Sequence, residues 1–169
     1  SAKQGGAIDM NSTHLSLSGV SLIENYAEEY GGGIFSLWGW DLNFDSLNRC
    51  NIYSNKAACG NDLYTTDLYG VTKVWIDTFT VMQPTPYHAT LIEKFDFDIS
   101  HSIHQQGDYD LYVSPDGDDN HSGLSQDDPL KTIDFAACIL LADAEQSGTI
   151  HLLDGIYSPS SNAEKFPIG

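Results

Sequence analysis

The first part of the chain repeats one pattern of hydrophobic and polar positions. Gly-Gly-Ala-Ile at residues 5–8 recurs as Gly-Gly-Ile at residues 32–34, so Ile8 and Ile34 lie 26 residues apart. An alternating apolar run follows each copy: first Leu15, Leu17, Val20 and Ile23, then Leu42, Phe44, Leu47 and Ile52. Each run closes on Asn-x-Ala, at residues 25–27 and 55–57, and a third, weaker copy begins at residues 59–64. A period of this length predicts a repeat architecture.

Short strands joined by glycine and asparagine corners are typical of a β-solenoid. Each strand places one or two apolar side chains inward with a period of two, and Gly and Asn adopt the corner conformations that other residues avoid. Because one coil cannot bury its own inner face, coils are stable only when stacked. We expect Asn25 and Asn55, at the same corner of successive coils, to form a side-chain ladder. A β-sandwich is the alternative, but it does not predict the returning Gly-Gly signature.

Residues 65–106 break this period. Residues 74–81 and 95–99 have strong β-propensity, and the two prolines between them favour an extended connection. In the second run, alternation puts Asp96 and Asp98 on one face, either as an acid–base or metal-binding pair or as part of a solvated outer face, and we expect the solvated face. We interpret the segment as closing strands and a linker, which leaves about two and a half coils in the chain.

A different pattern occupies residues 111–157. A short strand at residues 111–115 precedes an acidic, turn-rich loop at residues 116–123. Thr132 is the expected N-cap of an amphipathic helix that ends near Gly148, with one apolar stripe made of Ile133, Ala136, Ala137, Leu140 and Ala144. A strand at residues 149–153 and a turn at Asp154-Gly155 follow.

Both patterns resemble secreted bacterial repeat proteins with a right-handed parallel β-helix, the pectate-lyase-like solenoid fold. Residues 5–64 are similar to the coils of these proteins, and residues 111–157 are similar to the cap that starts such a helix. The resemblance implies an all-β fold with one short capping helix near the C-terminus, and an extracellular or cell-surface location. It also implies three regions: terminal coils at 1–70, closing strands and linker at 71–106, and the cap and first coil of a following β-helix at 107–169.

The order of these regions is unusual, because a start cap follows the coils. The chain is therefore expected to be a non-catalytic structural module, either excised from a tandem array or self-associating head to tail into a fibre. Its expected partners are copies of itself or adjoining β-helix domains. The expected assembly interface joins the two ends of the chain through Gly5, Gly6, Ile8, Phe166 and Ile168. No apolar leader is visible, so we expect a processed or excised part of a longer protein.

The charge balance narrows the choice of partners. The sequence has 24 Asp and Glu residues against 7 Lys and Arg residues, a formal net charge of −17. Such a surface repels nucleic acid, since phosphate binding requires clustered Lys and Arg, and no apolar run is long enough to span a membrane. An acidic surface also suits divalent cations, and calcium is the predicted ligand of the acidic loop through Asp116, Asp118, Asp119 and Asn120. An Asx-rich turn held by its own hydrogen bonds is the alternative, and we favour it over a calcium site.

The sequence is also compatible with two functions other than a structural one. Trp38, Trp40 and Trp75 could stack extracellular glycans, as in an adhesin, although Trp38 and Trp40 also suit an irregular coil. A polysaccharide lyase fragment is the third option, but Arg49, the only arginine, has no acidic residue beside it in the sequence. We therefore predict no catalytic residues. The three cysteines are expected to be small buried residues, with a Cys50–Cys59 bridge as the less favoured option.

Overall fold

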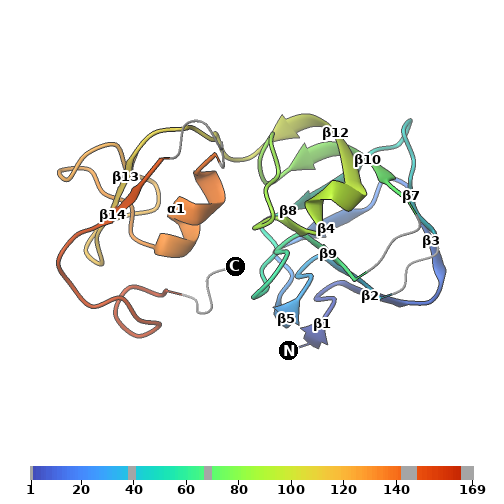
Figure 1. Ribbon diagram of the computed structural model, residues 1–169, viewed down its shortest axis with the longest axis horizontal. Coiled ribbons are helices and arrows are strands. Elements are labelled where there is room, and N and C mark those ends of the chain that lie inside the picture. The colour runs from blue at the N-terminus through green and yellow to red at the C-terminus, as the bar shows by residue number, and fades with distance from the viewer. Residues whose placement is uncertain (1, 38–40, 67–69, 142–147, 165–169) are drawn as a thin grey trace. The chain divides into compact units, whose positions relative to one another are not determined.

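The computed structural model describes residues 2–37, 41–66, 70–141 and 148–164. The chain divides into two compact units, unit 1 at residues 1–104 and unit 2 at residues 105–168 (Figure 1). All paired strands are parallel. Unit 1 is a parallel β-solenoid of about four turns. Trp38, Trp40, Phe166 and Ile168, which the sequence analysis singled out, lie outside the described residues.

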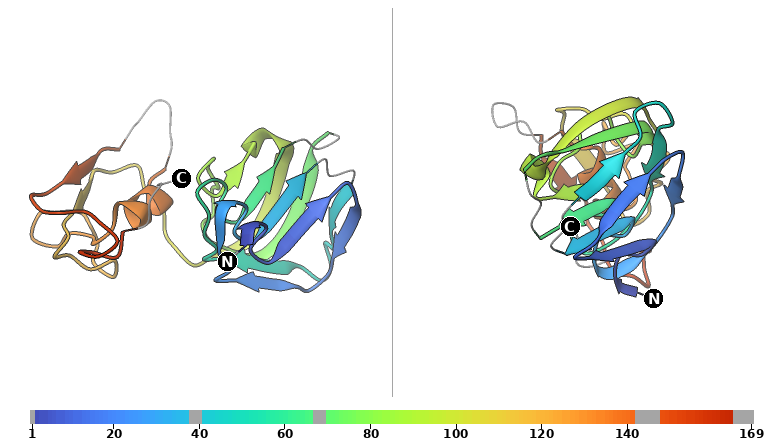
Figure 2. Two further views of the ribbon diagram at one scale, coloured as in Figure 1. Left: turned by 90° about the horizontal axis from the view of Figure 1, so that it is seen from below. Right: turned by 90° about the vertical axis from the view of Figure 1, so that its right-hand side faces the viewer.

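The strands of unit 1 form four columns that run along the solenoid. The first column contains β1 (Ala2–Gln4) and β5 (Ala27–Tyr30), and the third contains β3 (His14–Leu17) and β7 (Asp41–Phe44). The second is β2 (Ile8–Asn11), β6 (Ile34–Leu37), β9 (Leu63–Thr65) and β11 (Ala89–Thr90). The fourth is β4 (Ser21–Ile23), β8 (Cys50–Tyr53), β10 (Thr72–Phe79) and β12 (Phe95–Ser102), and a 3₁₀ turn η1 (Ile92–Lys94) precedes β12. Figure 2 shows these strands stacked side by side.

The register of the second column confirms the sequence repeat. Ile8, Ile34, Leu63 and Ala89 are paired in successive coils. Three residues before the first three of them, Gly5, Gly31 and Gly60 adopt φ values of 58°, 60° and 60°. Only glycine adopts this left-handed conformation without a steric cost. The weaker third copy that the sequence suggested is therefore a true coil.

The predicted asparagine ladder is also present. Asn25 donates from its side chain to Asn55 Oδ1 at 2.9 Å, and its backbone N–H donates to the same oxygen at 3.0 Å. Asn55 Nδ2 in turn donates to the carbonyl of Leu22 at 2.9 Å. Since Asn55 is 4% exposed, these bonds satisfy a buried amide and fix the same corner in two coils.

The expectation of two and a half coils was wrong. Strand β10 pairs with β8 on one side and with β12 on the other, so the segment predicted to close the solenoid forms further coils. Val74, Ile76 and Phe79 of β10 point inward and are fully buried. The repeat signature is lost here because β10 and β12 have eight residues each, twice the length of β8.

Unit 2 contains two short parallel strands, β13 (Leu111–Val113) and β14 (Ile150–Leu152), and the helix α1 (Ile133–Ile139). Thr132 is the N-cap, as predicted, and its side chain accepts the N–H of Phe135 at 3.1 Å. The helix is shorter than predicted. Leu140 has an extended backbone and pairs with Gly107, and these strand-like bonds end the helix at Ile139.

The cysteine expectation was correct for two residues of three. Cys50 and Cys138 are buried, whereas Cys59 is exposed. All three lie among the described residues, and none of them forms a disulfide bond there.

Two buried hydroxyl groups in the interior of unit 1 lack hydrogen-bond partners. Ser36 and Thr65 are paired in adjacent coils and are 1% and 0% exposed, and neither side-chain oxygen has a partner in the described structure. A buried polar group without a partner costs about 1–3 kcal/mol.

Thr65→Val is therefore expected to stabilise unit 1 by about 1 kcal/mol, because valine keeps the shape of threonine and removes the unpaired hydroxyl. Thr80→Val is the matched control, since the Thr80 hydroxyl donates to Asp62 and accepts the N–H of Ser54. We expect that control to destabilise unit 1. Urea denaturation followed by tryptophan fluorescence measures both effects, and an equal loss of stability in the two variants would contradict the argument.

Candidate functional site

On the outer face of β10 and β12, charged and aromatic side chains that lie far apart in the sequence come close together. Lys73 and Trp75 point outward from β10 and are paired in register with Asp96 and Asp98 of β12. Arg49, just before β8, completes this set, which we call the Trp75 cluster. The five side chains come from three coils, and parallel stacking places them together.

The ion pairs of the Trp75 cluster run across the strands. Lys73 Nζ lies 3.0 Å from Asp96 Oδ2. Arg49 Nη1 reaches across β10 and donates to Asp98 Oδ1 at 2.9 Å, to Ser100 Oγ at 3.0 Å and to the Ile76 carbonyl at 3.2 Å. The sequence does not reveal this pairing, because Asp98 lies 49 residues from Arg49.

Both cations of the cluster also lie over the indole ring. The guanidinium carbon of Arg49 is 5.2 Å from the ring centroid of Trp75, and Lys73 Nζ is 5.1 Å from it. Cation–π contacts of this kind contribute about 0.5–1 kcal/mol at exposed sites. A sugar stacked on Trp75 would have to displace these contacts. The geometry therefore favours a role of Trp75 in holding neighbouring coils together over a role in glycan binding.

The predicted calcium residues lie in the acidic loop of unit 2, and the carboxylates of Asp118 and Asp119 have partners within the protein. Asp118 Oδ1 accepts the N–H and the side-chain amide of Asn120 at 2.9 and 2.7 Å, and these bonds hold the pKa of Asp118 below its ordinary value. Asp119 turns toward the helix and accepts from Lys131 N, Thr132 N and Thr132 Oγ1, each at 2.9 Å. Asp116 is exposed.

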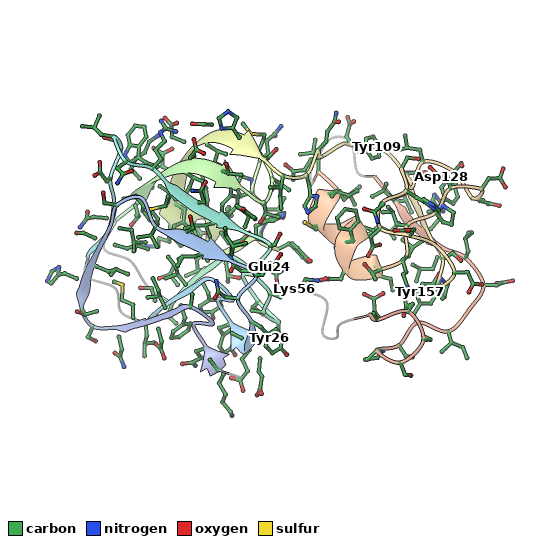
Figure 3. The ribbon with its side chains drawn as sticks, turned by 180° about the vertical axis from the view of Figure 1, so that it is seen from behind. Glu24, Tyr26, Lys56, Tyr109, Asp128 and Tyr157 are labelled. Carbon is green, nitrogen blue, oxygen red and sulfur yellow. The ribbon has the colours of Figure 1, made fainter. Side chains whose placement is uncertain are left out.

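Another part of the loop is held in the same way. Asp128 Oδ2 accepts the hydroxyl of Ser122 at 2.7 Å and its N–H at 3.0 Å, and these bonds lower the pKa of Asp128 (Figure 3). No group of three or more His, Cys, Asp or Glu side chains able to hold a metal ion occurs in the part of the chain that the structure describes. Calcium binding stays a prediction that only a binding measurement tests.

An exposed Asp–His pair lies at the start of the two strands of unit 2. His151 Nε2 is 2.9 Å from Asp110 Oδ2, and the N–H of Thr149 donates to Asp110 Oδ1 at 2.9 Å. The hydrogen bond from His151 is the main cause of a lowered pKa at Asp110. The His151 ring stacks on Tyr112, its register partner, with 4.9 Å between centroids. The pair links β13 to β14.

The expected assembly residues at the start of the chain face the second coil. The N–H groups of Gly5, Gly6 and Ile8 donate to the carbonyls of Tyr30, Gly31 and Gly33. A preceding coil would therefore meet the opposite edge of this segment.

The fold places the chain in the class of parallel β-solenoids, with mostly β structure and one short α-helix among the described residues. No protein-family model, curated protein or solved structure matches the chain. Among the described residues, no helix is long and apolar enough to cross a membrane.

Proposed function

We propose that the chain is a non-catalytic structural module of an extracellular, bacterial-type β-solenoid surface protein, and that it joins further coils head to tail. The observation that carries this proposal is the set of strand edges that have no partner among the described residues. Such edges present unpaired backbone donors and acceptors, and they favour the addition of another strand.

The first coil of unit 1 supplies one of these edges. Strands β1, β2, β3 and β4 end their sheets, and among the strands that the structure describes each pairs only with the coil that follows it. The coil itself is well packed, since Met10, Leu17 and Leu22 are 1%, 4% and 7% exposed. A preceding coil would therefore add mainly through backbone hydrogen bonds.

Unit 2 supplies the complementary edge. In the described part of unit 2, strand β14 pairs with β13 on one side only. Leu152 and Ile156 nearby are 52% and 74% exposed. Large apolar side chains at an unpaired strand edge are typical of a surface that another coil covers. Contacts between two different edges are heterologous, so identical chains joined in this way form open fibres.

The non-catalytic part of the proposal is supported by Arg49. Its guanidinium donates to Asp98, Ser100 and the backbone carbonyls of Ile76 and Asp98. These bonds connect three coils. They give Arg49 a structural role that does not require a catalysed reaction.

Sedimentation velocity over a range of concentrations, combined with electron microscopy, tests the proposal. We expect filaments of the intact chain at high concentration, and we expect Leu152→Lys to abolish them because lysine places a charge at the β14 edge. Leu124→Lys is the matched control, since Leu124 is 54% exposed but lies in a loop of the same unit.

The outcomes separate the two forms of the proposal. A chain that stays monomeric at every concentration would contradict the proposal that it forms fibres. The remaining form of the proposal would be a tandem array, in which adjoining domains cover the strand edges. Filaments that both variants still form would show that β14 is not the contact. The same measurements with and without a calcium chelator test the predicted ion, because loss of calcium should lower the thermal stability of unit 2.

A further inference from the structure

Asp62 is a fully buried carboxylate at the corner where the second, third and fourth coils meet. It precedes β9 and is 0% exposed. Its N–H donates to the carbonyl of His88 in the fourth coil, and its carbonyl accepts the N–H of Ile34 in the second. The backbone therefore fixes the residue between two neighbouring coils, and the side chain points into the polar ladder at this corner.

Among the described residues, the donors to the Asp62 side chain are neutral groups. Asn55 Nδ2 donates to Oδ1 at 2.9 Å, and Asn55 N donates to the same oxygen at 3.3 Å. Thr80 Oγ1 donates to Oδ2 at 2.7 Å. Asn55 follows β8 and Thr80 follows β10, so the carboxylate joins two coils through these bonds.

No cation neutralises this carboxylate within the described residues. The ion pairs of unit 1 involve other acids. The ionisable side chains of the segments packed around Asp62 include His88, Glu24, Lys56 and His104. The N–H of His104 donates to the carbonyl of Thr80, and burial lowers the pKa of its side chain. His88 directs Nδ1 to the N–H of Thr85. Glu24 and Lys56, the chain neighbours of Asn25 and Asn55, lie at the same corner of the coils (Figure 3).

Burial of a carboxylate without a cation opposes its ionisation. It raises the pKa of Asp62 to about 7, although the hydrogen bonds from Thr80 and Asn55 act in the opposite direction. The ordinary pKa of an aspartate, about 3.9 in an unfolded chain, lies well below this value.

We propose that Asp62 is a proton-operated switch of coil stacking: its neutral acid form tightens the packing of the second, third and fourth coils, and its ionised form loosens it. The switch does not depend on the head-to-tail assembly proposed above. It makes unit 1 more stable in mildly acidic surroundings than in neutral or alkaline ones.

The direction of the pH dependence follows from proton linkage. Between about pH 4 and pH 7 the folded chain holds a proton on Asp62 that the unfolded chain has released, so stability falls as pH rises through this window. The contribution of Asp62 to the stability of unit 1 is fully present below the pKa of Asp62 in the unfolded chain. It is lost as the pH rises above the pKa of Asp62 in the folded chain. A difference of about three pKa units predicts a loss of about a thousandfold in the folding equilibrium constant across the window.

Asp62→Asn isolates this effect from the titration of the other carboxylates. The amide has the same shape as the neutral acid and does not ionise. Urea denaturation between pH 4.5 and pH 8.5 is followed by tryptophan fluorescence, which reports unit 1 alone because the three tryptophans are residues 38, 40 and 75. We expect the variant to be more stable than the wild type at pH 8.5 and to lose most of the advantage at pH 4.5. Asp9→Asn, an exposed position on β2, should keep the wild-type dependence.

Parallel curves for the wild type and Asp62→Asn would overturn the proposal. A direct titration covers the case in which the variant fails to fold. Carbon-detected NMR of the wild-type side-chain carboxyl groups should show one aspartate with a midpoint near 7. A full set that titrates below pH 5 would equally overturn the proposal.

Discussion

Replacing Glu164 with alanine is expected to unfold unit 2 while leaving unit 1 intact. Glu164 is 1% exposed, and its carboxylate accepts the N–H of Ile133 at 2.9 Å and the N–H of Asp134 at 3.1 Å. These are the first two residues of α1, whose initial N–H groups have no partner inside the helix. The negative charge also favours the positive end of the helix dipole.

The complete N-terminus of α1 depends on three acceptors that lie far apart in the sequence. Asp119 accepts the N–H groups of Lys131 and Thr132, Glu164 accepts the next two, and the Thr132 side chain accepts that of Phe135. Alanine at 164 leaves two half-buried N–H groups unpaired, at about 1–3 kcal/mol each. The expected loss is about 4 kcal/mol, which is most of the stability of so small a unit.

Hydrogen exchange at the amides of unit 2 measures this loss, and tryptophan fluorescence checks that unit 1 stays folded, since the three tryptophans, residues 38, 40 and 75, all belong to unit 1. Glu164→Gln should cost less, because glutamine keeps one acceptor oxygen but turns an amide N–H toward the other backbone donor. Asp127→Ala, an exposed acidic position in the same unit, is the control and should change little. Wild-type protection of the Ile133 and Asp134 amides in Glu164→Ala would contradict the argument.

The second large effect is expected for Gly32→Ala in the repeat signature. A Cβ atom at this position would lie 2.5 Å from both the backbone nitrogen and the carbonyl oxygen of Lys56, and 2.6 Å from the carbonyl oxygen of Asn61. These atoms belong to the backbone of the next coil, and neighbouring strands are only about 4.8 Å apart. Alanine must therefore push two coils apart, at a cost of about 3 kcal/mol or more.

Gly70→Ala provides the comparison, since a Cβ atom there would meet nothing within 4 Å. Its φ of +83° should still cost about 1 kcal/mol. Both glycines lie in unit 1, so urea denaturation followed by tryptophan fluorescence ranks them directly. Equal losses would contradict the argument, because they would show that a Cβ atom at residue 32 does not force the two coils apart.

The sequence was a poor guide where local chemistry redirects a side chain. Leu47 was expected to continue an inward apolar run, but it is 96% exposed. The carboxylate of Asp45 accepts the N–H groups of Leu47 and Asn48 at 2.9 and 3.3 Å, and this turn directs Leu47 outward. The corners at Glu24 and Ser54 have φ values of 56° although neither is Gly or Asn, and the neighbouring asparagine ladder accounts for their position.

The sequence indicated some residues of the candidate site and not others. The sequence drew attention to Trp75, Asp96 and Asp98, but it did not reveal that Arg49 joins them. It also gave no sign of Glu164 or Asp62, because an isolated acidic residue has the same pattern whether it is buried or exposed. Their burial becomes visible only when the tertiary structure shows which backbone and side-chain groups surround each carboxylate.

The sequence by itself determined the repeat, its glycine and asparagine corners, and hence the parallel stacking of coils in unit 1. These features are local, since alternation, left-handed corners and close backbone approach each require particular residue types at particular spacings. The tertiary structure alone decided which polar groups meet, such as Asp62 with Thr80 and Glu164 with α1. Those partners are 18 and about 30 residues apart, and their meeting depends on the register of the coils and on the path of the returning chain, which no local pattern encodes.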